Sequence, residues 1–258
     1  MNQLLKGAAS LLPLVALCLL FVPAARAGGE SDFLAGQSKA CPNCSLHGAA
    51  LKRKDLSGAD LSGADLSLAV LHRARLFRAK LDGANLTSAN LNKTDLKNAS
   101  LAHAKLNEAM LYETDASAAD FAGADLSGAK LQHARLIRAK LDGAKLGEAL
   151  LTGAHLDEAS LSGAVLEAAN LVEATLRRAN LEAADLNNAG LVDAALREAN
   201  LKGANLSEAD LFAADFTNAN LEGADFSDSR LTRAVLTGAN LKGANFKGAI
   251  MPDGSVHE

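Results

Sequence analysis

Apolar residues recur at every fifth position along most of this chain, and the register does not slip. Forty such positions lie between residues 51 and 246, and leucine occupies all except Ala116, Phe121, Phe216, Phe226 and Phe246. An alanine stands two residues before nearly every one, and the residue between them is most often Asp or Asn. A period of five fits neither a helix, on which the leucines would point in all directions, nor a flat strand, on which they would alternate between faces.

The five-residue pattern instead predicts a coil with one short extended segment on each side. In each segment the alanine and the leucine point inward and the Asp or Asn points outward, while the other two residues turn a corner. Glycine is common at the second corner position, as at Gly63 and Gly143, where it eases a tight turn. Rows of leucine and alanine, with no tryptophan and one tyrosine, suit a narrow tube.

The repeat also carries a family resemblance. Residues 58–66 read GADLSGADL, which matches the repeat A-(D/N)-L-x-x, and the chain therefore resembles the pentapeptide-repeat proteins over residues 46–251. The resemblance implies an all-β fold, a right-handed quadrilateral β-helix with four pentapeptides to a coil and about ten coils. With roughly 4.8 Å between coils, the rod would be on the order of 48 Å long, and its stability would be nearly additive along its length.

The first 27 residues are typical of a secretory signal peptide. Lys6 supplies a positive start, residues 8–22 are apolar, and residues 25–27 read A-R-A, which fits a cleavage site after Ala27. The apolar run is interrupted by Pro13 and is short for a membrane span, which needs about 20 residues. We therefore expect a periplasmic or secreted chain that is not an integral membrane protein, with an uncleaved anchor as the alternative.

Residues 28–45 are expected to cap the first coil. A capped helix is predicted to begin at Ser31 and to end at Pro42. Cys41 and Cys44 form a CxxC pair, and in an oxidising compartment the first interpretation is a local disulfide. A redox-active pair, a metal site and two free thiols are the alternatives.

Residues 252–258 form a tail that is too short to be a substantial cap. The last coil is therefore expected to present an open edge, and an open edge favours an end-to-end homodimer.

Charge is unevenly distributed along the predicted rod. Without residues 1–27 the chain carries 24 basic and 30 acidic side chains, a net charge of −6. Residues 51–145 have a net charge of +4 and residues 146–258 a net charge of −9. The rod is therefore expected to have a positive front and a negative rear.

A block of basic residues occurs twice. Residues 71–86 read LHRARLFRAKLDGANL and residues 131–146 read LQHARLIRAKLDGAKL, an offset of 60 residues or three coils. The two copies define a candidate basic interaction strip: Arg75, Arg78, Lys80, Arg135, Arg138 and Lys140. Corresponding residues lie roughly 14 Å apart along the rod, and Asp95 and Asp115 stack between the arginines at 75 and 135 and neutralise part of their charge.

Two interpretations of this strip remain open. One is a recent duplication of a three-coil block with solvated charges. The other is a docking surface for an anionic partner, such as an acidic protein, a cell-wall polymer or lipid head groups.

Catalytic, cofactor-binding and metal-binding residues are not predicted. Residues twenty apart stack in neighbouring coils, and this rule brings no two histidines together. Outward Asp and Asn residues belong to the repeat itself, and a convex rod has no cleft that would shift their pKa values.

The sequence thus favours a non-catalytic exported rod that acts in the cell envelope as a structural or protein-interaction element, with an envelope protein or an anionic polymer as partner. Some proteins of the resembled family look like duplex DNA and bind type II topoisomerases, so a DNA-mimic function is the alternative if the chain is not exported. Export and a charge of only −6 argue against that alternative, and no nucleic-acid partner is expected. A thiol, redox or metal function of Cys41 and Cys44 is the remaining possibility.

Overall fold

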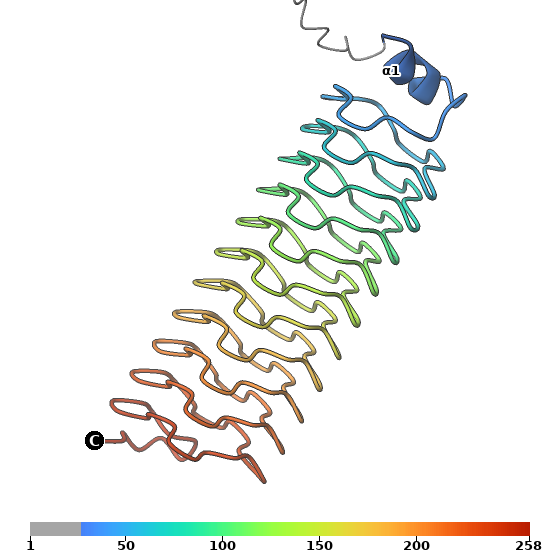
Figure 1. Ribbon diagram of the computed structural model, residues 1–258. Coiled ribbons are helices and arrows are strands. Elements are labelled where there is room, and N and C mark those ends of the chain that lie inside the picture. The colour runs from blue at the N-terminus through green and yellow to red at the C-terminus, as the bar shows by residue number, and fades with distance from the viewer. Residues whose placement is uncertain (1–26) are drawn as a thin grey trace, which may run out of the picture.

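The computed structural model describes residues 27–258, which form one rod with a short helix at its N-terminal end (Figure 1). The helix α1 spans Ala27–Leu34, and beyond it the coils are joined by isolated one-residue bridges. Parallel bridges connect residues twenty apart, from Ala40 with Asp60 to Arg230 with Ile250. Four pentapeptides therefore complete one coil, as the resemblance to the pentapeptide-repeat proteins implied.

The outward bridge residues form four rows, one on each face of the rod. Face A carries the row from Ala40 to Asn240, face B the row from Ser45 to Asn245, face C the row from Ala50 to Ile250, and face D the row from Asp55 to Val235. The chain runs through the faces in the order A, B, C, D, so faces A and C are opposite. Each corner is named by the two faces that it joins.

Leucine and alanine rows fill the interior, and nearly all of these side chains are fully buried. Near the C-terminal end the rings of Phe226 and Phe246 stack with centroids 5.0 Å apart, as their spacing of twenty predicted. Where a hydroxyl replaces an inward alanine it finds a carbonyl, as Thr114 Oγ1 donates to Leu91 O at 2.6 Å. Burial of these hydroxyls therefore leaves no donor unsatisfied.

Backbone hydrogen bonds between coils hold the rod together. The leucine and the second corner residue each donate to the following coil, and the outward residue donates to the preceding coil. At Leu61, Gly63 and Asp65 these bonds measure 2.8, 2.9 and 2.9 Å. The alanine closes the corner by donating to the leucine carbonyl, as Ala64 does at 3.0 Å.

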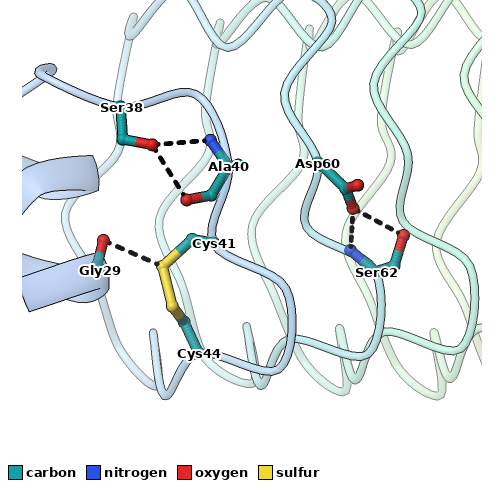
Figure 2. The surroundings of a disulfide bond; sticks show 7 residues. All are labelled: Gly29, Ser38, Ala40, Cys41, Cys44, Asp60 and Ser62. Atoms are coloured by element: carbon teal, nitrogen blue, oxygen red, sulfur yellow. Dashed lines mark hydrogen bonds between the residues drawn. A yellow bond between two sulfur atoms is a disulfide. The ribbon is translucent and has the colours of Figure 1, made fainter. Parts of the chain in front are cut away.

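One N–H group of the repeat remains, that of the first corner residue. The outward Asp or Asn accepts its hydrogen bond. Oδ1 of Asp60 accepts both the backbone N–H and the hydroxyl of Ser62, at 3.2 and 2.8 Å (Figure 2). Where this residue is Ser100, a carboxylate of the preceding coil substitutes, and Asp82 Oδ1 accepts the N–H of Ala102 at 3.1 Å. The preference for Asp and Asn before the leucine thus follows from capping the corner.

In each repeat from Asn43 to Gly248, the residue at the second corner position has a positive φ. Together with the closing hydrogen bond, this conformation defines type II turns. Glycine is required where a neighbouring side chain covers the corner: a Cβ on Gly153 would lie 2.6 Å from Nδ1 of His133.

The N-terminal cap differs from the predicted helix at both ends. Ser31 lies inside α1 rather than at its start, and α1 ends at Leu34, before Gly36 with a φ of 76°. Glycine in this conformation terminates helices without strain, so the expected end at Pro42 was wrong. Phe33 is 4% exposed and packs against the first coil, which anchors the cap.

The C-terminal tail folds back over one side of the last coil. Val256 pairs antiparallel with Ile250, and Gly248 N donates to His257 O at 2.8 Å. Leu241, on the side that the tail does not reach, is 37% exposed. The expected open edge is therefore present only in part.

Replacing Leu161 with Ala should lower the free energy of unfolding by about 2 to 5 kcal/mol, because the leucine side chain is fully buried. Glu167→Ala, on the outside, should change it by less than about 0.5 kcal/mol. Denaturant melts of both variants measure the difference, and equal effects would contradict the inward register.

Replacing Asp60 and Asp65 with Asn should preserve stability at neutral pH and reduce its loss in acid. The pKa of each carboxyl lies below its usual range because the hydroxyls of Ser62 and Ser67, and then their N–H groups, donate to it. A carboxylate of this kind stabilises the fold above its unfolded pKa of about 3.9, and the contribution is lost as pH falls through the folded value.

The amide of Asn accepts the same hydrogen bonds without titrating. Urea melts at pH 7 and pH 3 should show a smaller acid loss for the Asn variants than for the native chain, while Asp60→Ala should be destabilised at both pH values. An acid loss as large in the Asn variants as in the native chain would refute this role.

Candidate functional site

Cys41 and Cys44 are joined by a disulfide at the first corner of the rod, beneath α1 (Figure 2). Cys41 is 1% exposed, and its Sγ atom lies 3.5 Å from Gly29 O of the helix. The disulfide therefore closes the first corner, and the sulfur of Cys41 contacts the cap. Within residues 27–258, no group of three His, Cys, Asp or Glu side chains is placed to hold a metal ion.

The six residues of the basic interaction strip wrap one corner of the rod. Arg75 and Arg135 lie on face D, Arg78 and Arg138 at the DA corner, and Lys80 and Lys140 on face A. The structure therefore places the two copies of the strip on the same side of the rod, as their offset of 60 residues predicted.

Four of the six cations pair with carboxylates of adjacent coils. On face D, Arg75 lies 3.6 Å from Asp55, and Arg135 lies 3.7 Å from Asp115. The other two pairs are Arg138 with Glu158 at 2.7 Å and Lys140 with Asp120 at 3.5 Å. These side chains are mostly exposed, so each pair adds little stability but reduces the free positive charge.

Arg78 and Lys80 are different. The guanidinium of Arg78 lies 5.0 Å from the centroid of the Phe77 ring, and neither Arg78 nor Lys80 forms an ion pair with any residue from 27 to 258. The front copy of the strip therefore keeps two cations that can meet an external anion.

The DA corner continues as an alternating ladder of charge that the sequence reasoning did not identify. Arg138, Glu158, Arg178 and Glu198 follow one another at intervals of twenty, and Arg178 Nε donates to Glu198 Oε2 at 2.7 Å. The hydrogen bonds and charges of the arginines hold the pKa values of both glutamates below their usual range. Alternation of sign at a spacing of twenty was the available signal.

A shallow hollow of about 500 Å³ lies along this ladder, between residues 157 and 218. Its carboxylates face arginines of neighbouring coils, as Glu198 Oε2 faces Arg178 Nε at 2.7 Å. The hollow is therefore lined by matched charges that the rod itself provides.

The CD corner carries a second feature missing from the sequence-based prediction. Lys52, Arg53, His72 and Arg73 gather there at the front of the rod, and none of them forms an ion pair within the described chain. Desolvation, followed by the nearby charges of Arg73 and Lys52, lowers the pKa of His72. The signal was again a spacing of twenty, between Arg53 and Arg73.

No helix between residues 27 and 258 combines the length and the apolar character that crossing a membrane requires. Residues 1–26, where the signal peptide is predicted, lie outside the described residues.

The chain belongs to the pentapeptide-repeat family. The model of pentapeptide repeats matches it in eight copies within residues 44–251. This match confirms the resemblance that the repeat predicted, and it accounts for the four-sided coil.

Among solved structures, the chain is similar to HetL, a pentapeptide repeat protein involved in heterocyst differentiation regulation in the cyanobacterium Nostoc sp. strain PCC 7120. The two are 37% identical, the match covers 88% of this chain and 97% of HetL, and the TM-score is 0.72. QnrB1, a plasmid-mediated fluoroquinolone resistance protein, is 19% identical over 78% of this chain and 90% of its own, with a TM-score of 0.39. No curated protein sequence matches the chain significantly.

Proposed function

We propose that this protein is a non-catalytic rod that acts in the cell envelope by binding other macromolecules. The observation that carries the proposal is the use of its polar side chains: outward Asp and Asn residues cap corners, and most charged residues of the basic interaction strip pair between coils. Structural ion pairs also shift pKa values, so a shift by itself does not mark a reactive site. Here the lowered pKa values of Asp60 and Glu158 arise from a corner cap and from an ion pair.

We propose the front copy of the basic interaction strip as the docking surface for an anionic group of an envelope protein or polymer. Arg78 and Lys80 are exposed and form no ion pair in the part of the chain that the structure describes, although the charge of Lys80 helps to lower the pKa of Asp60. Arg138 and Lys140 occupy the equivalent positions three coils away but are already paired. The chain thus contains both a candidate surface and its own control.

Arg78→Glu with Lys80→Glu should weaken capture of the partner by cross-linking in intact cells, and native capture should fade as salt rises, because exposed charges are screened over about 10 Å at 0.1 M. Arg138→Glu with Lys140→Glu is the matched control and should have the smaller effect. Equal capture by the native chain and both variants would exclude the basic interaction strip as a docking surface. Duplication of a three-coil block would then be the remaining interpretation.

Residues 1–27 are proposed to direct export and to be removed after Ala27. The cut would fall at the first residue of α1 and leave the rest of the cap in place. Amino-terminal sequencing of the native protein, together with cell fractionation, should find Gly28 as the first residue and the protein outside the cytoplasm.

A chain that retains Met1 and stays in the cytosol would refute export. It would favour a second candidate function, a cytoplasmic regulatory binding protein, which the 37% identity to HetL supports. An end-to-end homodimer also stays a prediction, with the exposed Leu241 at the uncovered side of the last coil as its contact.

A further inference from the structure

One column of corner residues changes sign along the rod. The second corner positions of the CD corner are stacked in successive coils, about 4.8 Å apart. In order they are Arg53, Arg73, Lys93, Glu113, His133, Gly153, Glu173, Asp193, Ala213 and Arg233, and the part from Arg53 to Asp193 is called the CD column. Basic residues occupy one end of the CD column and acidic residues the other, and its midpoint lies between Glu113 and His133. Ala213 and Arg233 follow beyond the acidic end, in the last two coils.

The charges at the two ends of the CD column are not matched within the chain. Arg53, Arg73, Glu173 and Asp193 are all exposed, and none forms an ion pair with another described residue. Like charges stacked in adjacent coils repel each other. The ladder at the DA corner shows the opposite arrangement, in which Arg138 and Glu158 alternate and bond at 2.7 Å.

We propose that face C and the CD corner form an interface with a second copy of this chain, arranged antiparallel and side by side. The two-fold axis lies in the plane between the copies and is perpendicular to the rods. It makes the CD column of one copy face the CD column of the other, which runs in the opposite direction. About the midpoint of the column, Arg53 then faces Asp193 of the other copy, and Arg73 faces Glu173. Two-fold symmetry makes both contacts twice.

A parallel pair does not give this complementarity. With the two-fold axis along the rods, the CD corner of one copy would face the BC corner of the other at the same level. Arg73 would then lie opposite Leu68, and Glu113 opposite Glu108. The basic end would stay unmatched and two acids would meet, so the charges select the antiparallel arrangement.

Face C is suited to contact from residue 50 to residue 190, where it carries little charge. Beyond this part its Asp210 and Arg230 pair with each other at 2.6 Å. Along the span of the CD column its outward residues are Ala50, Val70, Asn90, Met110, Lys130, Leu150, Asn170 and Gly190, of which only Lys130 is charged. Face A over the same coils presents Asp60, Lys80, Asp120 and Lys140. A nearly uncharged strip bordered by complementary charges has the composition of a protein interface.

Tyr112 lies close to the proposed axis. Its side chain is 39% exposed, and its ring meets the ring of His133 edge to face with centroids 5.8 Å apart. Both copies would bring this tyrosine to the centre of the contact, where aromatic residues contribute most to association.

Two variants with reversed charges, measured alone and mixed, test the arrangement. Both are made from the full chain in the form isolated from cells. One variant carries Arg53→Glu and Arg73→Glu, and the other carries Glu173→Arg and Asp193→Arg. Each alone should lose the dimer in sedimentation velocity, with a dissociation constant raised about tenfold or more, because like charges then meet at both junctions. An equimolar mixture should recover the dimer, since each junction again joins opposite charges.

Lys80→Glu with Lys140→Glu, on the opposite face, is the matched control and should leave the dimer intact. Small-angle scattering should give a dimer only a little longer than one rod, whereas an end-to-end dimer would be nearly twice as long. A native chain that stays monomeric at 100 µM in low salt, a dimer of doubled length, or a mixture that remains monomeric would overturn the proposal. Recovery in the mixture also shows that both variants are folded.

Discussion

The hydrogen bond that each second corner residue makes to the next coil is the interaction on which the rest of this structure depends. A left-handed conformation costs about 1–2 kcal/mol for a residue other than glycine, yet most corners here carry such residues. The same conformation points the corner N–H along the rod, as Arg53 N donates to His72 O at 3.1 Å. The turn and the coil stacking are therefore one constraint. From Asn43 to Gly248 the chain meets it with glycine and with unbranched-Cβ side chains as different as Arg, Glu, Leu and Ala, but with no β-branched residue.

The inward positions were predictable because residue type alone determines them. A leucine that recurs every fifth residue has one arrangement that buries all copies, and the stacking of Phe226 on Phe246 follows from that register. The bounds of α1 depend instead on the packing of Phe33 against the first coil and on the turn at Gly36. The local sequence pattern around Ser31 indicates neither of these features. The sequence therefore predicted a cap but not where its helix begins and ends.

For the candidate site, the sequence predicted positions better than interactions. The offset of 60 residues placed Arg78 and Arg138 on one corner, but Glu158, which pairs with Arg138, lies outside the repeated block. Partners in a solenoid come from residues twenty away, so similarity between blocks does not identify them. The same rule reveals the CD column, whose members Arg53 and Glu173 belong to no repeated block.

Inward residues determine the fold, and corner residues form the surface. Because these positions are separate, the surface can change while the fold stays the same. Insertion of one pentapeptide would preserve every inward leucine but turn all later coils by one face, so each surface column would break at that point. Insertion of twenty residues, or of 60, keeps the columns aligned. The basic block that occurs twice obeys this restriction, since its offset of 60 residues is a whole number of coils. Growth of the rod by whole coils thus conserves what is presented on each face, whereas growth by single repeats conserves only the tube.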